Sequence, residues 1–541
     1  MKRFLAVCCS LGMLLALPGC GSGKNTDVQN VLRVGSDGEP ASLDPYLVTG
    51  HTEHRILTSL FEGLTTANQK TLEVEPGVAE SWEVTPDGLT YTFKLNPNAK
   101  WSNGEPVTAH DFVYGWKRHL TAKLASEYAY MLWCLKNGEK YNKGEVADFN
   151  EVGAKAVDDT TLVVNLEYPA PYFLSMQIHY SWFPVHQATV EKFGPMDDRT
   201  NRWILPGNMV SNGPFKLISW EPNQSIRVEK NEHYWDAARI KLEAVEFYPS
   251  DDLSVQERRF RSKEVDVIET LLATKVDTYR KENPDVLFIE PFVGTYFYRF
   301  NTTRPPFNDV RVRRALAMAI DRESICRDVL YNVVVPAAAF TPPGLAGYTA
   351  EASIPYNLEE ARNLLTEAGF PNGQGFPAVE ILYNISEDHQ RIAEAIQDMW
   401  KKNLGINVGP ANKEWKVYLS SLTTLNYDIA RSAWIADFMD PINYHECFIT
   451  DGGNNRTGWS NAEFDRLVSE ARFELDQTKR YAALQQAEKI MMEEAPIAPI
   501  YSYRQRFLKS PDVKGLDANV QGYLNYRYIY VERTAPESTG N

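Results

Sequence analysis

The sequence has little cysteine and no excess of positive charge. Six cysteines occur in 541 residues, and only Cys134, Cys326 and Cys447 lie beyond the first twenty positions. At most one disulfide can form among these three, and none of them has the close Cys/His spacing of a structural zinc site, so we expect buried free thiols. Lysine and arginine number 56 against 71 acidic residues, which gives a net charge of −15. Such a surface repels phosphate backbones, and nucleic acid is therefore not an expected partner.

Short catalytic motifs are also missing. The sequence contains no Walker loop, no Gly-x-Gly-x-x-Gly fingerprint, no Gly-x-Ser-x-Gly elbow and no His-Glu-x-x-His zincin motif. These absences argue against an enzyme, and no cofactor is expected. A remote alternative stays open, namely a secreted hydrolase that uses an unrecognised carboxylate pair among the 71 acidic residues.

The N-terminus has the features of a bacterial export signal. Two basic residues precede an apolar run over 4–17, which is shorter than the roughly 20 residues needed to span a bilayer. The run ends in Leu17-Pro18-Gly19-Cys20, which resembles a bacterial lipobox apart from its proline. We therefore expect a signal peptide over 1–19, lipidation of Cys20, a polar tether over 20–30, and a body held at a membrane outside the cytoplasm. Ordinary signal cleavage, with Cys20 an incidental thiol, is the alternative.

Strand-like and helix-like patterns alternate along the chain, which at 541 residues is long enough for three or four domains. A helix is predicted to begin at Thr108, and another begins with the cap pair Asn357 and Glu360 and stops at Gly369. Aromatic residues make up 12% of the chain, more than core filling requires, so some are expected to line a cleft. The clearest succession of elements, strands at 89–95 and 162–166 and then helix 387–403, strand 406–411, helix 413–424 and strand 427–435, indicates an α/β protein.

Two pairs of polar residues are candidates for a site. His51 and His54 share a face if they lie on a helix, but two ligands are too few for a metal site and a hydrogen-bonded pair is the simpler interpretation. Arg431 and Asp437 are an even number of residues apart, hence on one face if the strand continues that far. A guanidinium and a carboxylate so placed match the two ends of a zwitterion. Alternatively, Asp437 caps a helix and Arg431 makes a surface ion pair.

Several segments resemble one known family. The stretches 79–95 and 101–114 are similar to the family-5 substrate-binding proteins of bacterial ABC importers. Further similar stretches are 42–45, 61–63, 211–215 and 308–313, so the resemblance covers essentially everything after residue 31. Within the family, Tyr383-Asn384, Lys413-Glu414-Trp415 and the stretch 433–437 most resemble the oligopeptide and murein-peptide binders; dipeptide, nickel-chelate and haem binders are more distant members.

The resemblance implies a two-lobed, three-domain α/β fold of the periplasmic-binding-protein type, with a hinge and a ligand cleft between the lobes. Domain I would comprise 31–61, 173–293 and 505–541, domain II 62–172, and domain III 294–504. The family also implies a monomer that captures short peptides and delivers them to an ABC permease. Murein-peptide, dipeptide, nickel-chelate and haem binding stay open as alternatives, as does an envelope scaffold without ligand.

The resemblance also implies roles for individual residues. Asp437 matches the carboxylate that holds a peptide α-ammonium, and Arg431 and His389 match groups that meet the peptide carboxylate. Four other side chains, Trp415, Trp434, Asn384 and Tyr114, would contribute walls and polar contacts, and the backbones near Ala433 and His51 would hydrogen-bond an extended peptide.

The sequence departs from the family pattern in three ways, one of which is the expected lipidation of Cys20, since the relatives are freely soluble periplasmic proteins. Gly294 and Ile435 stand where the oligopeptide binders often carry the two halves of a disulfide. Leu330 stands where a lysine can meet the carboxylate of longer peptides. The bridge is therefore expected to be dispensable, and a preference for five-residue ligands is not expected.

Overall fold

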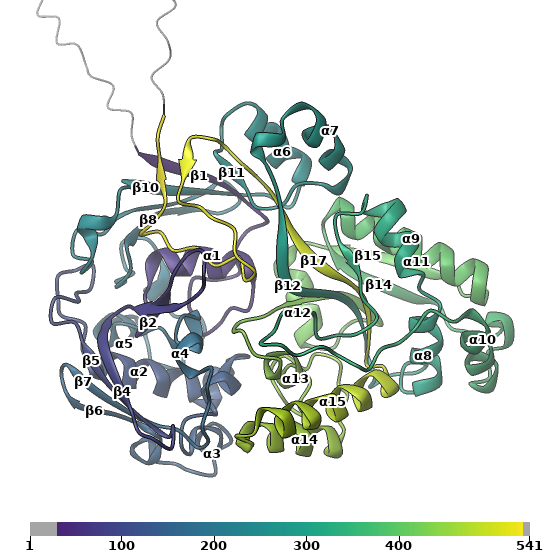
Figure 1. Ribbon diagram of the computed structural model, residues 1–541, viewed down its shortest axis with the longest axis horizontal. Coiled ribbons are helices and arrows are strands. Elements are labelled where there is room, and N and C mark those ends of the chain that lie inside the picture. Colours follow the sequence, from purple (N-terminus) through teal and green to yellow (C-terminus); the bar gives the residue numbers. More distant parts are fainter. Residues whose placement is uncertain (1–29, 534–541) are drawn as a thin grey trace, which may run out of the picture.

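The computed structural model describes residues 30–533 (Figure 1). The predicted signal peptide, Cys20 and most of the tether lie outside the described residues, as does the C-terminal stretch 534–541. Within the described part, no helix combines the length and the apolar character needed to cross a membrane. Cys134, Cys326 and Cys447 are buried and unpaired, as predicted.

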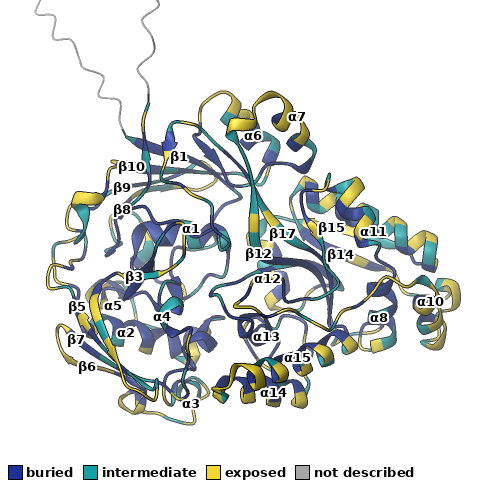
Figure 2. Ribbon diagram, in the orientation of Figure 1, coloured by how far each residue is buried: buried dark blue, intermediate teal, exposed yellow. Residues whose placement is uncertain are grey.

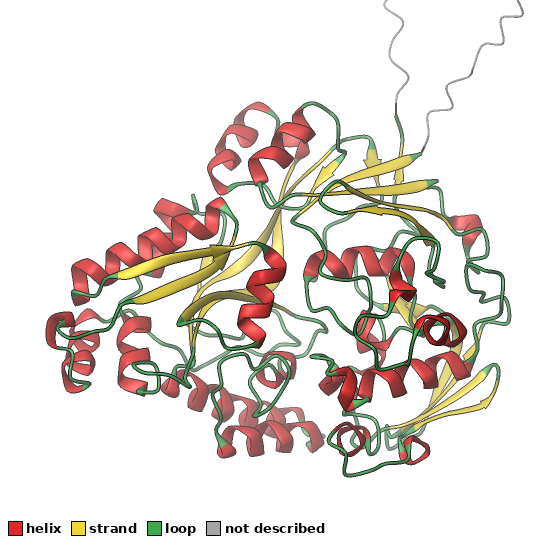
Figure 3. Cartoon of the chain, turned by 180° about the vertical axis from the view of Figure 1, so that it is seen from behind, coloured by secondary structure: helices red, strands yellow, loops and turns green. Residues whose placement is uncertain are grey.

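Within residues 30–533, one large mixed sheet of eleven strands runs through the molecule. Its two longest strands, β12 and β17, are antiparallel partners that pass between the two halves of the chain, and the view from behind shows long strands crossing the middle with helices on either side (Figure 3). In sheet order the strands are β15 (Val408–Lys413), β14 (Val379–Asn384), β16 (Ile429–Ile435), β12 (Leu287–Phe300), β17 (Ile497–Lys509), β11 (Val267–Ile268), β1 (Val31–Ser36), β10 (Ala244–Pro249), β9 (Ser225–Lys230) and β8 (Phe215–Glu221), with β13 (Val335–Pro336) paired to β17 outside this order.

Smaller sheets complete the first lobe, by which we mean the stretches predicted as domains I and II. A four-stranded antiparallel sheet packs under helix α2, and both belong to the stretch predicted as domain II. The predicted domain boundaries themselves stay predictions. The strands of the three small sheets are β4 (Ala79–Val84), β5 (Thr90–Leu95), β7 (Thr161–Asn165) and β6 (Ala154–Asp158); β2 (Thr65–Ala67) and β3 (Val74–Pro76); and β18 (Val513–Lys514) and β19 (Tyr530–Val531).

Most helices bury one face and expose the other (Figure 2), whereas α13 is buried along its whole length. Helix α2 begins with a complete capping box of Thr108 and Asp111, and the Asn357 side chain accepts the Glu360 backbone N–H at the start of α10. Both predicted helix starts are therefore confirmed. The helices are α1 (His51–Leu60), α2 (Ala109–Leu120), α3 (Gly138–Asn142), α4 (Phe173–Met176), α5 (Gln187–Phe193), α6 (Leu253–Arg261), α7 (Val276–Glu282), α8 (Val310–Met318), α9 (Arg322–Ser324), α10 (Leu358–Glu367), α11 (Glu387–Leu404), α12 (Trp415–Thr423), α13 (Ile442–Glu446), α14 (Ala462–Phe473) and α15 (Gln477–Glu494).

A buried ion pair joins α2 to the loop after β1. Arg118 donates from Nη1 and Nη2 to the two carboxylate oxygens of Asp44, at 2.9 and 2.6 Å, and both residues are almost completely buried. Trp203 Nε1 donates to the same carboxylate at 3.2 Å. Because two opposite charges and their hydrogen bonds are satisfied together, this pair fixes the packing of three distant segments.

Strand β16 has one edge that is only partly covered. β12 pairs with it along its whole length, from Phe300–Ile429 to Gly294–Ile435. On the other edge, β14 pairs with Ile429 and Ala430 alone. From Arg431 to Ile435 this edge has no partner strand within residues 30–533, and the Arg431 carbonyl accepts a hydrogen bond from the Tyr418 hydroxyl at 2.6 Å instead. We call this stretch of β16 the free edge.

Candidate functional site

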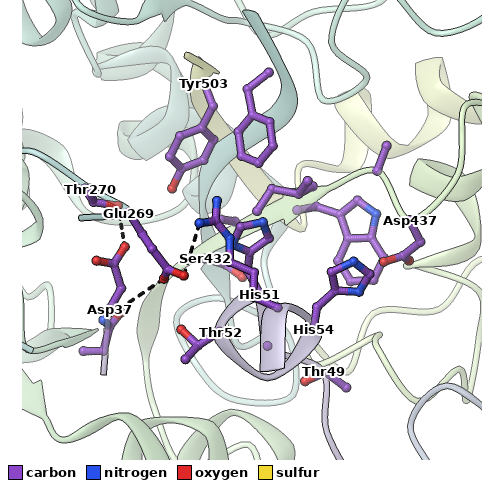
Figure 4. A pocket seen from close by; sticks show the side chains of 18 of the residues that line it. Asp37, Thr49, His51, Thr52, His54, Glu269, Thr270, Ser432, Asp437 and Tyr503 are labelled. Carbon is purple, nitrogen blue, oxygen red and sulfur yellow. Dashed lines mark hydrogen bonds and ion pairs between the residues drawn. The ribbon is translucent and has the colours of Figure 1, made fainter. Parts of the chain in front are cut away.

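A cavity of about 330 Å³ lies between the two lobes, and the free edge of β16 forms part of its wall. Residues of the first lobe line one side, from the segments 49–55 and 178–180 and from Tyr128. The opposite side comes from 384–389, α12, β16 and the residues that follow β16. Figure 4 shows Asp437 and His54 toward one end of the cavity and Asp37 and Glu269 toward the other, with His51 between them.

Asp437 is a buried carboxylate whose hydrogen-bond donors, among residues 30–533, are all neutral. It accepts hydrogen bonds from the Tyr128 hydroxyl (3.1 Å) and from Asn443 Nδ2 (3.1 Å). His179 Nε2 lies 3.4 Å from Asp437 Oδ1, and burial keeps the pKa of this histidine well below its usual value, so the ring is neutral. Burial raises the pKa of Asp437 to about 7. The ionised form of such a carboxylate is stabilised most by a cation, and a ligand can supply that cation.

Arg431 is the complementary group, a buried guanidinium without a carboxylate partner within 4 Å among the described residues. It donates to Asn384 Oδ1 at 3.0 Å and to the Tyr503 hydroxyl at 3.2 Å, and it lies over the Tyr296 ring at 5.2 Å. Its Nε is buried and has no hydrogen-bond partner in the described part of the chain. The arrangement leaves a full positive charge to be neutralised by an anion.

The strand does not continue far enough to place Arg431 and Asp437 on one face. β16 ends at Ile435, and Asp437 lies beyond it, where its backbone N–H donates to Asn443 Oδ1 at 3.0 Å. Strand alternation therefore does not place the two side chains on one face. They meet because both line the same cavity, and Asp437 is not the N-cap of α13.

Most of the other predicted site residues line the cavity as well. His389 lies in the first turns of α11 beside Tyr296, with ring centroids 5.6 Å apart, and its Nδ1 is buried without a partner among the described residues. The remaining members that line the cavity are His51, Asn384, Trp415, Ala433 and Trp434.

Tyr114 is the exception. It lies on α2, is buried against the core, and is not part of the cavity wall. The prediction that it contacts the ligand is corrected, because α2 turns this residue toward the interior of its own lobe.

His51 and His54 share the first turn of α1, with ring centroids 6.4 Å apart, as their spacing predicted. No cluster of three or more His, Cys, Asp or Glu side chains within residues 30–533 is arranged to hold a metal ion. His54 instead stacks on His179 at 5.6 Å. The histidines therefore form an aromatic and polar wall that leads to Asp437.

The two departures from the family pattern that fall within the described residues have plain structural outcomes. Gly294 and Ile435 are direct cross-strand partners in the β12–β16 ladder, so they lie where a bridge would join the two strands. The ladder itself holds these strands together here. Leu330 is fully buried and does not reach the cavity wall.

Some residues of the cavity were not predicted from the sequence. Tyr128 and His179 touch Asp437, and Arg299 and Arg456 line the cavity near the free edge. They come from four segments far apart in the chain. Tyr128, His179 and Arg456 lie in turns and bends between the helices and strands, so no periodic sequence pattern marks them.

Comparisons with known proteins agree with this geometry. Residues 73–456 match the model of the bacterial extracellular solute-binding proteins, family 5, middle region. The chain is 36% identical to the oligopeptide-binding protein OppA of Bacillus subtilis, across 98% of this chain and 99% of that protein. It is 38% identical to the periplasmic murein peptide-binding protein MppA of Escherichia coli, across 91% of each chain.

Solved structures share the fold and distinguish two arrangements of the lobes. The E. coli murein tripeptide-binding protein MppA superposes with a TM-score of 0.89 at 36% identity, covering 94% of this chain and 99% of that one. Haemophilus influenzae OppA in complex with RPPGFSPFR gives 0.89 at 33% identity, covering 93% and 99%. The unliganded open form of MppA gives only 0.63, at 36% identity and with coverage of 93% and 98%. The lobes described here are therefore not arranged as in that open form.

Proposed function

This chain belongs to the family 5 bacterial extracellular solute-binding proteins, which are binding proteins of peptide ABC importers and not enzymes, and we propose that it captures short peptides by their charged termini and their backbone. The observation that carries the proposal is the pair of opposite, unneutralised charges in one enclosed cavity. Arg431 is the first residue of the free edge of β16, Asp437 lies two residues beyond its last, and both line the cavity. A free peptide supplies the missing partner of each.

The ammonium end of the peptide is assigned to Asp437. Tyr128, Asn443 and His179 hold the carboxylate in place but bring no charge, so a ligand ammonium would supply the cation that the described part of the chain does not. Charge-assisted hydrogen bonds of this kind are about twice as strong as neutral ones. Tyr128 and His179 come from the other lobe, so the anchor is complete only when the lobes are close together.

The carboxylate end is assigned to Arg431, with His389 as a further contact on the same wall. Six residues of extended chain separate Asp437 from Arg431, which corresponds to about 20 Å at most. An extended peptide of three to five residues spans about 10–17 Å, and the two side chains supply the remaining reach. Short peptides are therefore the ligands that fit between the charges.

The backbone of the peptide is assigned to the free edge. Alternate residues of a strand direct their N–H and C=O groups to the same edge, so Ala433 and Ile435 share the edge at which the Arg431 carbonyl accepts from Tyr418. A peptide that runs from Asp437 toward Arg431 adds to β16 as an antiparallel strand. Main-chain bonding does not depend on the side chains of the ligand, and low sequence selectivity follows.

The family supports a role in delivering the bound peptide to a membrane permease. Its members work outside the cytoplasm, and we propose that the loaded protein presents its peptide to an ABC permease. Lipidation of Cys20 would hold the protein at the membrane surface near that permease. We expect the protein to act as a monomer, because a single anchored chain can both bind a peptide and reach the permease.

The test is calorimetric titration of the protein, unfolded and refolded to remove any bound ligand, with tripeptides to pentapeptides. N-acetylated and C-amidated forms of each peptide and murein tripeptide serve as comparisons. We expect free peptides to bind and N-acetylation to abolish binding, because the acetyl group removes the cation that Asp437 requires. Binding that survives both modifications would contradict the assignment of the termini, and absence of binding by every peptide would contradict the proposed function.

Peptide affinity is expected to depend on pH through Asp437. Its pKa of about 7 in the empty cavity means that the carboxyl is increasingly protonated below neutral pH, whereas the bound ammonium favours the ionised form. Binding must then release a proton, so Kd should rise by up to about tenfold per pH unit as the pH falls from 7 toward 5. Burial keeps the pKa of His54 near 4 and that of His179 lower than usual, so neither histidine titrates in this range. A Kd that is constant between pH 5 and pH 8 would contradict this expectation.

A further inference from the structure

One short segment of the first lobe, residues 127–130, touches the second lobe directly. The Glu127 carboxylate forms an ion pair with Arg456, and it accepts a hydrogen bond from the Thr423 hydroxyl at 2.9 Å. A Cβ atom on Gly453 would collide with the Glu127 backbone, so the two loops pack as closely as a glycine allows. We call residues 127–130 the clasp, and by the second lobe we mean the stretch predicted as domain III.

The other residues of the clasp reach the second lobe as well. Asn454 Nδ2 donates to the Tyr130 hydroxyl at 3.4 Å. Tyr128 donates to Asp437 at 3.1 Å, and its ring centroid lies 6.3 Å from that of Trp434. Both tyrosines are buried. Tyr128 lines the cavity, whereas Tyr130 does not, so most of the clasp holds the two lobes together outside the ligand site.

Aromatic contacts extend this direct contact between the lobes. The ring of Tyr172 stacks on that of Phe438 at 4.8 Å, and the ring of Tyr168 meets that of Phe473 edge-on at 5.0 Å. None of these four residues belongs to the cavity wall. Burial of such rings is favourable whether or not a peptide is present. The closed arrangement is therefore stabilised by contacts that need no ligand.

The carboxylate of Asp437 opposes the same arrangement while the cavity is empty. Tyr128 and His179 of the first lobe cover it, at 3.1 and 3.4 Å, and neither of them carries a charge. Covering an ionised carboxylate with neutral groups costs free energy because the carboxylate loses water, and the raised pKa of Asp437 reflects that cost. A ligand ammonium offsets the cost, since it pairs with the charge that closure buries.

The carboxylate end of the peptide site lacks this dependence on closure. Arg431 donates to Asn384 and to Tyr503, and both of these partners belong to the second lobe, as Arg431 itself does. Closure therefore changes the surroundings of Asp437 more than it changes the hydrogen bonds of Arg431. The ammonium end is the place where ligand binding and closure are coupled.

We propose that the clasp holds the lobes together in the closed form, and that the negative charge of Asp437 opposes this closure until a peptide ammonium binds there. This inference rests on the proposed function and adds a mechanism of closure to it. A ligand shifts such an equilibrium by as much as its interactions differ between the two forms, and the buried ion pair with Asp437 supplies that difference. Glu127 then affects the affinity for every peptide although it is not part of the cavity wall.

The first test is small-angle X-ray scattering, because the radius of gyration distinguishes open lobes from closed ones. We expect the peptide-free Asp437→Asn variant to have a smaller radius of gyration than the peptide-free unaltered protein, since closure no longer buries a charge. Equal or larger dimensions of the variant would overturn the inference. So would an unaltered protein that is equally compact with and without a tripeptide. The comparison of the two peptide-free proteins requires no binding, so it is independent of the proposed function.

The second test removes the charge of the clasp. In Glu127→Gln the side chain keeps an acceptor for Thr423 but loses the charge that faces Arg456. We expect Kd to rise about fivefold to tenfold, alike for tripeptides of different sequence and mainly through faster dissociation. An unchanged Kd, or a change confined to some peptides, would overturn the inference. Asp159→Asn, an exposed acid of the first lobe, is the control and should leave Kd unchanged.

A double variant assigns the closure to the clasp. Adding Glu127→Gln to Asp437→Asn should open the peptide-free protein again, and dimensions that stay as small as those of Asp437→Asn would overturn the assignment. Thermal unfolding identifies a variant that does not fold, and Arg456→Gln then replaces Glu127→Gln. If no peptide binds to any of these proteins, the proposed function fails, and the scattering of the peptide-free proteins still decides whether the clasp closes the lobes.

Discussion

Replacing Asp437 with asparagine is expected to weaken peptide binding by about 3 kcal/mol, or roughly a hundredfold in Kd. Asparagine keeps the shape and the contacts with Tyr128 and Asn443 but removes the charge that pairs with the ammonium. Calorimetric titration with a free tripeptide measures the loss. The same variant should also lose most of the pH dependence of binding between pH 5 and pH 7, because the titrating group is gone.

The stability of this variant separates an anchor from a structural residue. The pKa of Asp437 is higher in the folded chain than the ordinary value of 3.8, so its ionisation opposes folding increasingly as the pH rises from about 4 to 7. Asp437→Asn should therefore unfold at an equal or higher temperature than the unaltered protein at pH 7. Asp451→Asn, an exposed change of the same charge on the same lobe, is the control and should alter neither property. A variant that binds normally, or that loses binding only because it unfolds, would contradict the anchor.

Removal of Asp44 is expected to cause the largest loss of stability. Asp44→Ala leaves the Arg118 guanidinium buried without its partner, and breaking such a pair costs about 3–5 kcal/mol. Trp203 loses an acceptor at the same time. Chemical unfolding followed by tryptophan fluorescence measures the change, which we expect in the transition of the first lobe.

A double variant and an exposed pair give the controls. Asp44→Val combined with Arg118→Met removes both charges, so it should be less destabilised than Asp44→Ala. Asp328→Ala breaks an exposed pair with Arg327 and should leave the unfolding midpoint unchanged. If Asp44→Ala and Asp328→Ala behave alike, the buried pair does not hold α2 to the loop after β1.

Local signals in the sequence predicted elements better than their ends. Helix α2 begins where its cap indicated, and helix α11 begins at Glu387, the first residue of the predicted helix 387–403. The strand predicted at 406–411 begins two residues later, at Val408. Ile406 donates its N–H to the Trp400 carbonyl after the left-handed Gly405, so it belongs to the end of α11 and not to the strand. A hydrophobic residue just after a helix can either pack against the end of that helix or begin the next strand, and the periodicity of the sequence does not distinguish these two cases.

Recognisable motifs marked part of the candidate site. Asp437, Trp415 and Asn384 lie in segments that resemble the peptide binders, and all three line the cavity. Tyr128 and Arg299 do not stand in such motifs, and their roles depend on contacts across more than a hundred residues of sequence. Tyr114 illustrates the converse, since a motif can match while the side chain points into the core. Tertiary packing, not local pattern, decides which polar groups reach the cavity.

The free edge of β16 also bears on aggregation. An unpaired strand edge is a template on which another chain can add a strand, and proteins usually protect such edges with charge, proline or a bulge. Here the edge lies inside the cavity between the lobes, which admits a short extended chain but excludes a strand that is already part of a folded sheet. The enclosure thus acts as a size filter. It keeps the hydrogen-bonding groups available for capture of small peptides and withholds them from polymerisation of the protein itself.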